Sequence, residues 1–186
     1  MKKENWNESN IPDQSGKIFI VTGPTSGLGE ETTRVLSRKN ATVIMAARNI
    51  KKAESVANEI LAENKNAKID IEELDLTSLE SIKNFSHQIF KKYKNLDCLI
   101  NNAGIMACPY SKTKDGFEIQ MGTNHLGHFA LTGKLISLLK KTQNSRVVNV
   151  SSIAHTSGNI DFDDLNWEKR KYRTWSAYSD SKLANL

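Results

Sequence analysis

The sequence has few cysteines and no long apolar run, and each shortage excludes a class of protein. Its two cysteines, Cys98 and Cys108, do not have the spacing of a metal or redox motif, so a reduced, cytosolic chain is the natural interpretation. No apolar segment approaches the roughly 20 residues that span a bilayer. The polar leader, residues 1–16, contains no signal-peptide core. The sequence therefore predicts neither a membrane segment nor a secretory signal.

Clustered basic residues are also missing. The chain has 26 lysines and arginines against 21 acids, a net charge of +5, but no basic run is interleaved with aromatic residues. The lysines are spread through segments with helical periodicity, as on solvated helix faces. We therefore expect no nucleic-acid surface. A length of 186 residues, with 38% hydrophobic and 25% charged residues, fits one globular domain with a single core.

What the sequence does contain is a repeated alternation of short apolar runs and amphipathic segments. The apolar runs predict strands at residues 17–22, 42–47, 69–74, 96–100 and 146–150. Helical periodicity predicts helices at residues 28–36, 53–61, 79–93 and from about 116 to 141. This alternation predicts an α/β fold in which a parallel sheet has helices on both faces. Ligands are then expected at the carboxyl ends of the strands.

A glycine-rich turn, residues 23–29, separates the first predicted strand from a helix. Gly23, Gly27 and Gly29 would let the backbone approach a phosphate, whose charge is favoured at a helix N-terminus. The spacing departs from the general G-x-G-x-x-G fingerprint, because the wider gap comes first. A plain tight turn is the alternative interpretation. The position between a strand and a helix favours phosphate binding.

Arg48 follows the second predicted strand, at the position that distinguishes cofactors in nicotinamide-binding folds. An acid there pairs with the free ribose hydroxyls, whereas an arginine accommodates a 2′-phosphate. Residues 42–53 contain no Asp or Glu, but they contain Arg48, Lys51 and Lys52. The pattern favours NADP over NAD. The alternative is that these cations only mark the exposed start of a helix.

Polar residues follow the remaining strands at the same edge of the predicted sheet. Asp75 follows the third strand, Asn102 follows the fourth, and Ser151 and Ser152 follow the fifth. Adjacent residues of a strand face opposite sides, so only one of the two serines can face a ligand at this edge. Asn124 lies inside the long predicted helix without a propensity reason, and is therefore either exposed or functional.

Tyr178 and Lys182 lie four residues apart near the end of the chain, which on a helix places both side chains on one face. An ammonium group beside a phenol stabilises the phenolate. The hydroxyl then becomes a usable proton donor and acceptor near neutral pH. Such a pair alone is weak evidence for catalysis, because two exposed helix residues can have the same spacing. The preceding motifs are what give it meaning.

Together these motifs resemble the short-chain dehydrogenase/reductase family. The matching elements occur in the family's order and extend over nearly the whole chain after the leader: residues 22–29, 75–76, 101–104, Asn124, Ser152 and residues 178–182. Residues 115–118, 124–129 and 181–186 are most similar to the retinol dehydrogenase branch and its bacterial oxidoreductase relatives. The resemblance implies a Rossmann-type doubly wound sheet. It also implies hydride transfer between NADP and a lipophilic alcohol or carbonyl substrate.

The resemblance further implies a role for each matching residue. The expected cofactor contacts are Gly23, Ser26, Gly27, Leu28 and Gly29 at the pyrophosphate, Arg48 at the 2′-phosphate, Asp75 and Leu76 at the adenine, and Asn102, Ala103 and Gly104 at the nicotinamide ribose. No metal is expected. His125 and His128 lie three residues apart, but no cysteine or third histidine joins them, which favours packing or surface roles.

The catalytic set implied by the resemblance is Asn124, Ser152, Tyr178 and Lys182. Tyr178 would be the acid or base toward the substrate oxygen, and Lys182 would hold the nicotinamide ribose and activate the phenol. Ser152, the second serine in the family pattern, would hydrogen-bond the reacting oxygen. Asn124 would position Lys182 through a water molecule. Pairing of two copies through the two long helices is also implied.

Two features depart from the family. Pro24 and Thr25 stand where close relatives often have alanine and asparagine, which affects the details of the pyrophosphate turn. The sequence also ends at Leu186, whereas family members continue into further strands and a segment that covers the substrate. We therefore expect residues 17–186 to form a dinucleotide-binding domain that is incomplete at its C-terminus, with the fifth strand as an exposed edge. A nucleotide-binding module without catalysis, or an inactive fragment, is the alternative.

Overall fold

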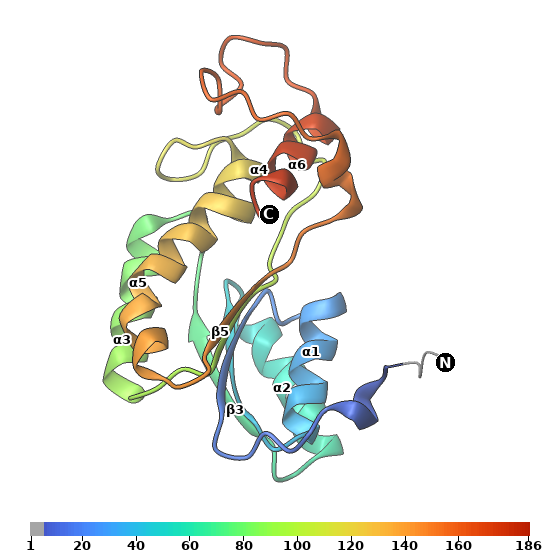
Figure 1. Ribbon diagram of the computed structural model, residues 1–186, viewed down its shortest axis with the longest axis vertical. Helices are drawn as coiled ribbons and strands as arrows, with labels where there is room; N and C mark the ends of the chain where they lie inside the picture. Colours follow the sequence, from blue (N-terminus) through green and yellow to red (C-terminus); the bar gives the residue numbers. More distant parts are fainter. Residues whose placement is uncertain (1–5) are drawn as a thin grey trace.

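A five-stranded sheet forms the centre of the molecule in the computed structural model, which describes residues 6–186 (Figure 1). The first five residues of the predicted leader lie outside the described residues. The strands are β1 (Ile18–Thr22), β2 (Thr42–Ala47), β3 (Lys68–Glu73), β4 (Cys98–Asn101) and β5 (Arg146–Asn149). Their order is β3-β2-β1-β4-β5, and all neighbouring strands are parallel. This arrangement confirms the predicted doubly wound α/β fold.

Helices cover both faces of the sheet (Figure 1). The four long helices are α1 (Gly27–Arg38), α2 (Ile50–Glu63), α3 (Leu79–Lys92) and α5 (Gly127–Lys141). Because side chains alternate along a strand, Ile20 of β1 packs with α3 and α5, whereas Val21 packs with Leu36 of α1. Two apolar layers therefore enclose the sheet. The shorter elements are η1 (Glu8–Asn10), η3 (Ile153–Ser157) and the C-terminal α6 (Thr174–Leu183).

The long helix expected from about residue 116 differs from the prediction in two ways. It begins later, as the single turn α4 (Ile119–Met121), because the Glu118 carboxylate caps it by accepting from the N–H groups of Gln120 and Met121. A π turn, η2 (Gly122–Leu126), then separates α4 from α5. Apolar periodicity does not reveal this widening, which lies at Asn124. Such turns are often found at functional sites.

β5 is an open edge of the sheet, as expected from the sequence. Val147 and Val148 are 38% and 43% exposed, although both are apolar. Unpaired strand edges present a row of free N–H and C=O groups. The carboxyl ends of the strands point toward the part of the chain that contains α4 and α6 (Figure 1).

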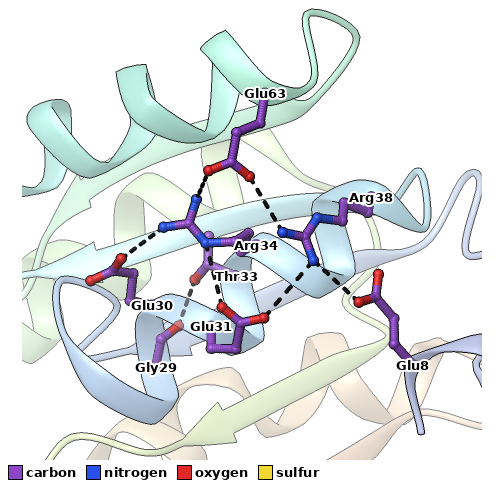
Figure 2. Close-up of polar contacts among 8 residues, drawn as sticks. All are labelled: Glu8, Gly29, Glu30, Glu31, Thr33, Arg34, Arg38 and Glu63. Carbon is purple, nitrogen blue, oxygen red and sulfur yellow. Dashed lines mark hydrogen bonds and ion pairs between the residues drawn. The ribbon is translucent and has the colours of Figure 1, made fainter.

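An ion-pair network joins η1, α1 and α2 (Figure 2). It contains Arg34 and Arg38, one turn apart on α1, together with Glu8, Glu30, Glu31 and Glu63. Arg34 is the more buried of the two arginines, with a side chain 13% exposed against 40% for Arg38. The described part of the leader is thereby held against α1.

Replacing Arg34 with alanine is expected to lower the free energy of unfolding by about 1 kcal/mol, because a partly buried network is worth more than an isolated exposed pair. The matched control is Arg38→Ala, whose loss should be less than half as large because its charge is better solvated. Urea unfolding at low and high salt measures both, and the Arg34 loss should shrink as salt screens the charges. Equal losses, or no effect of salt, would contradict this interpretation.

Candidate active site

A cavity of about 590 Å³ lies at the carboxyl ends of the strands. The predicted cofactor-binding residues that line it are Gly23, Ser26, Leu28, Gly29, Arg48, Asp75, Leu76, Asn102, Ala103 and Gly104. Gly27 belongs to the same turn but does not line the cavity wall. The sheet topology therefore brings together side chains from four separate stretches of sequence, as expected for a crevice outside the ends of parallel strands.

The glycine turn has a backbone that only glycine adopts easily. Gly23 and Gly27 have φ angles of +63° and +56°. A Cβ atom on Gly29 would collide with the carbonyl oxygen of Gly23, so this position requires glycine for close packing. Ser26 is the N-cap of α1, but its side chain forms no capping hydrogen bond. The first N–H groups of α1 therefore remain available to an anion at the cavity.

Charged side chains lie at one end of the cavity. Arg48, directly after β2, and Lys52, in the first turn of α2, both line it. Among residues 6–186, no acid pairs with Arg48. Asp75 instead accepts hydrogen bonds from Thr77 and from Lys114, whose Nζ lies 3.0 Å away. Burial raises the pKa of Asp75, but these hydrogen bonds outweigh it and hold the pKa below its ordinary value.

The loop after β4 is tied to the end of β1. The Thr22 hydroxyl accepts hydrogen bonds from the N–H groups of Asn102 and Ala103, at 3.0 and 2.9 Å. The Asn102 side-chain amide donates back to the carbonyl oxygens of Thr22 and Gly23, at 2.9 and 3.3 Å. Asn102 thus holds the glycine turn with its side chain. The loop and the turn, joined by these hydrogen bonds, form one wall of the cavity.

Tyr178 and Lys182 lie on α6 as the spacing predicted. The Lys182 Nζ is 5.8 Å from the centroid of the Tyr178 ring and donates to the Val150 carbonyl oxygen at 3.1 Å. It also lies against Gly104, because a Cβ atom there would be 3.4 Å from the same Nζ. Lys182 is 5% exposed, and burial lowers the pKa of its ammonium group. Lys182 therefore stands beside the loop that lines the cavity, and Tyr178 lies one turn before it on α6.

Asn124 clamps this loop to α6. Its side-chain oxygen accepts from the Ile105 N–H at 2.8 Å, and its amide donates to the Ile105 carbonyl and to the Ser181 hydroxyl, each at 2.9 Å. Asn124 is fully buried. It is therefore neither a surface residue nor a direct partner of Lys182, but it joins the two segments that carry Gly104 and Lys182.

The two serines after β5 differ in their partners. The Ser151 hydroxyl donates to the Lys182 carbonyl oxygen at 2.7 Å. Ser152 caps η3, accepting from the Ala154 N–H at 3.2 Å. Within the described part of the chain, no hydrogen bond joins the Ser152 hydroxyl to Tyr178. Ser152 is half-buried at the end of β5, and its predicted catalytic role stays a prediction.

Three residues at this site were given no contact with the cofactor or substrate by the sequence. Thr22 and His128 belong to the hydrogen-bonded framework of the site. The Nε2 of His128 forms a hydrogen bond with the Thr22 hydroxyl, and its Nδ1 forms one with the main-chain oxygen of Asn124. These bonds agree with a packing role for His128, as expected. Thr123 lines the cavity, and its buried hydroxyl has no hydrogen-bond partner among the described residues. A buried hydroxyl usually has a partner, so Thr123 is suited to a bound group.

The family model described as short chain dehydrogenase matches residues 17–163. The chain belongs to the short-chain dehydrogenase family. The chain is 49% identical to human (Homo sapiens) retinol dehydrogenase 13 over 169 residues. The aligned residues make up 91% of this chain and 51% of that protein. It is 50% identical over 171 residues to retinol dehydrogenase 12 of Mus musculus, and this alignment includes 92% of this chain and 54% of that protein. It spans about half the length of the curated relatives that it matches.

Solved structures support the same family. A protein of Mycobacterium Paratuberculosis superimposes with a TM-score of 0.87 and 47% identity, over 98% of this chain and 63% of that one. A short chain dehydrogenase from Shigella flexneri 2a, complexed with NADP, superimposes with a TM-score of 0.72 and 29% identity. The superposition includes 92% of this chain and 68% of that one. The similarity to the retinol dehydrogenases and to bacterial oxidoreductases confirms the predicted branch.

The residues of the cavity fit a nicotinamide dinucleotide, which members of this dehydrogenase family bind. The uncapped start of α1 suits a pyrophosphate, and Arg48, which pairs with no acid in the part of the chain that the structure describes, suits a further phosphate. The partnerless hydroxyl of Thr123 offers a hydrogen bond inside the cavity. Within residues 6–186, no helix is both long and apolar enough to cross a bilayer.

Proposed function

We propose that the chain forms the cofactor-binding and catalytic part of an NADP-dependent oxidoreductase, which transfers a hydride between nicotinamide and an alcohol or carbonyl substrate. The observation that carries this proposal is that the Lys182 Nζ lies against Gly104, which lines the same cavity as the glycine turn, and is 5.8 Å from the centroid of the Tyr178 ring. NADP, when bound, would supply or accept the hydride. The protein residues hold the cofactor and move the proton.

The binding roles follow from the positions of the residues along the cavity. The turn from Gly23 to Gly29 would hold the pyrophosphate, Arg48 with Lys52 would hold the 2′-phosphate, and Asp75 with Leu76 would border the adenine. Asn102, Ala103 and Gly104 would lie beside the nicotinamide ribose. An NADP complex of a family member at 29% identity supports the choice of cofactor.

Proton transfer is assigned to Tyr178. Its phenol would give a proton to, or take one from, the substrate oxygen, and the Lys182 ammonium would stabilise the phenolate. One N–H of Lys182 is used by the Val150 carbonyl, which leaves two for ribose hydroxyls. Ser152 would hydrogen-bond the substrate oxygen. Asn124 would keep Lys182 in place through the loop that it clamps.

A lipophilic substrate is supported by the surroundings of Tyr178. The Trp175 ring lies edge-on to the Tyr178 ring, at 6.2 Å between centroids, and is 60% exposed. Ile153, directly after Ser152, is 84% exposed.

The free thiols of Cys98 and Cys108 fit a reducing, cytosolic compartment. The exposed Phe129 and Ile136 of α5 support the pairing of two copies through this helix.

A second function is nucleotide binding without turnover, which is favoured by the observation that neither Tyr178 nor Lys182 lines the cavity. Both functions require cofactor binding. NADPH at a hundred times its dissociation constant is expected to stabilise the fold by about 2.7 kcal/mol, measured by thermal unfolding and fluorescence titration. NADPH consumption with lipophilic aldehydes and ketones separates the two. Absence of any NADPH effect would refute both.

A further inference from the structure

His128 is a buried histidine that connects the two sides of the site. It lies in the first turn of α5 and is 3% exposed. Its Nε2 is 2.9 Å from the Thr22 hydroxyl, and its Nδ1 is 2.9 Å from the main-chain oxygen of Asn124. Thr22 is the last residue before the glycine turn, and Asn124 clamps the loop after Gly104 to α6. The imidazole thus bridges the cofactor side and the catalytic side.

The partners of His128 determine its tautomer. A carbonyl oxygen can only accept, so Nδ1 has the proton and donates it to Asn124. Nε2 is then an acceptor, and the Thr22 hydroxyl donates to it. That hydroxyl already accepts from the N–H groups of Asn102 and Ala103, which occupy both of its lone pairs. Every donor and acceptor is matched when the imidazole is neutral with its proton on Nδ1.

We infer that His128 is a positioning residue of this site, whose neutral imidazole directs the Thr22 hydroxyl so that it holds the loop of residues 101–104 against the cofactor cavity. The inference rests on the proposed function, because the loop matters to function only if the cavity binds the dinucleotide. No role in proton transfer to substrate is assigned to His128. It acts through Thr22 and Asn124.

Protonation of His128 would break this arrangement. A proton on Nε2 would need a lone pair on the Thr22 oxygen, where both are in use. The Thr22 hydrogen would have to turn to the Ile100 carbonyl, which is farther away at 3.3 Å. One of the N–H groups of Asn102 and Ala103 would lose its acceptor. The loop would therefore loosen in acid.

The surroundings of His128 keep it neutral. Burial lowers its pKa to about 4, and the positive charge of Lys182 on α6, together with His125 on the π turn, acts in the same direction. The hydrogen bond to the Asn124 carbonyl opposes this shift, because it favours the protonated ring. The acid limit of cofactor binding is therefore expected close to that value and well below the ordinary pKa of histidine.

Two substitutions separate the two bonds. His128→Gln places an uncharged amide near Nε2, which can still accept from Thr22, whereas His128→Asn keeps a donor near Nδ1 and leaves Thr22 without its acceptor. At neutral pH we expect the NADPH dissociation constant to rise about tenfold in His128→Asn and about threefold in His128→Gln. The control is His87→Gln, the same change on the exposed face of α3.

The pH profile is the readout that a merely structural role would not change. Wild-type affinity for NADPH is expected to fall as the pH approaches about 4, whereas His128→Gln should lack this limb because its amide does not titrate. Dividing the two profiles removes the titration of the cofactor phosphate itself. Nitrogen NMR of the histidine-labelled chain should show the neutral ring with its proton on Nδ1, and thermal melts establish that each variant is folded.

The outcomes are distinguishable. If the wild type binds no NADPH at any pH, the proposed function fails and this inference fails with it. If the wild type binds NADPH but His128→Asn binds equally well, or if His128→Gln keeps the acid limb, the inference alone is wrong. A ring with its proton on Nε2 at neutral pH would also overturn it.

Discussion

Replacing Tyr178 with phenylalanine is expected to lower kcat by about three orders of magnitude, within the range of roughly 10²–10⁴ that a positioned acid or base contributes. The substitution removes only the phenol oxygen. The ring and its contact with Trp175 remain. Neither Tyr178 nor Trp175 lines the cavity at the glycine turn. NADPH affinity should therefore change by less than about threefold, because the lost oxygen belongs to a residue that does not line the cavity. The measurement is NADPH consumption with lipophilic aldehydes, together with an NADPH titration.

The control for Tyr178 is Tyr110→Phe. Tyr110 is 42% exposed, and its hydroxyl donates to the Asn166 carbonyl at 3.2 Å, away from the cavity lining. Its loss should leave kcat unchanged. A Tyr178→Phe enzyme that keeps a tenth or more of the wild-type kcat would show that another group moves the proton. Loss of both turnover and NADPH binding would instead indicate a damaged fold.

The parts of the fold that could be predicted are those encoded by short-range patterns. Short apolar runs, and in residues 69–74 an alternation of apolar and acidic residues, indicated the five strands, and the amphipathic segments between them indicated the parallel topology. Because parallel strands end at a common edge, Arg48, Asp75 and Asn102 can be assigned to one site from the sequence alone. All three line the same cavity.

What could not be predicted depends on contacts between distant residues. The bond between Thr22 and His128 spans 106 positions, and nothing near either residue signals it. The orientation of the Asn102 side chain is likewise set by distant residues, because its amide donates to the carbonyl oxygens of Thr22 and Gly23. Ser78 caps α3, whereas the hydroxyl of its neighbour Thr77 donates to Asp75. Local rules do not distinguish such neighbouring hydroxyls.

Arg48→Asp is expected to lower the ratio of NADPH affinity to NADH affinity by about a hundredfold or more. A charge-assisted hydrogen bond contributes roughly 1.5–3 kcal/mol, or about 10- to 150-fold in affinity. The new carboxylate would also repel a phosphate and pair with free ribose hydroxyls. Arg48 is suited to this role because it is exposed at the end of β2 and lines the cavity. Fluorescence titration of both cofactors at one ionic strength measures the ratio.

Two neighbouring lysines sharpen this test of Arg48. Lys51→Asp makes a similar change of charge at the start of α2, but Lys51 does not line the cavity, so its effect should be limited to long-range attraction that salt screens. Lys52 does line the cavity. If Arg48→Asp leaves the ratio unchanged while Lys52→Asp lowers it, the phosphate contact belongs to α2 rather than to the end of β2. If the Lys51 and Arg48 variants shift the ratio equally, the discrimination comes from net charge and not from contact with a 2′-phosphate.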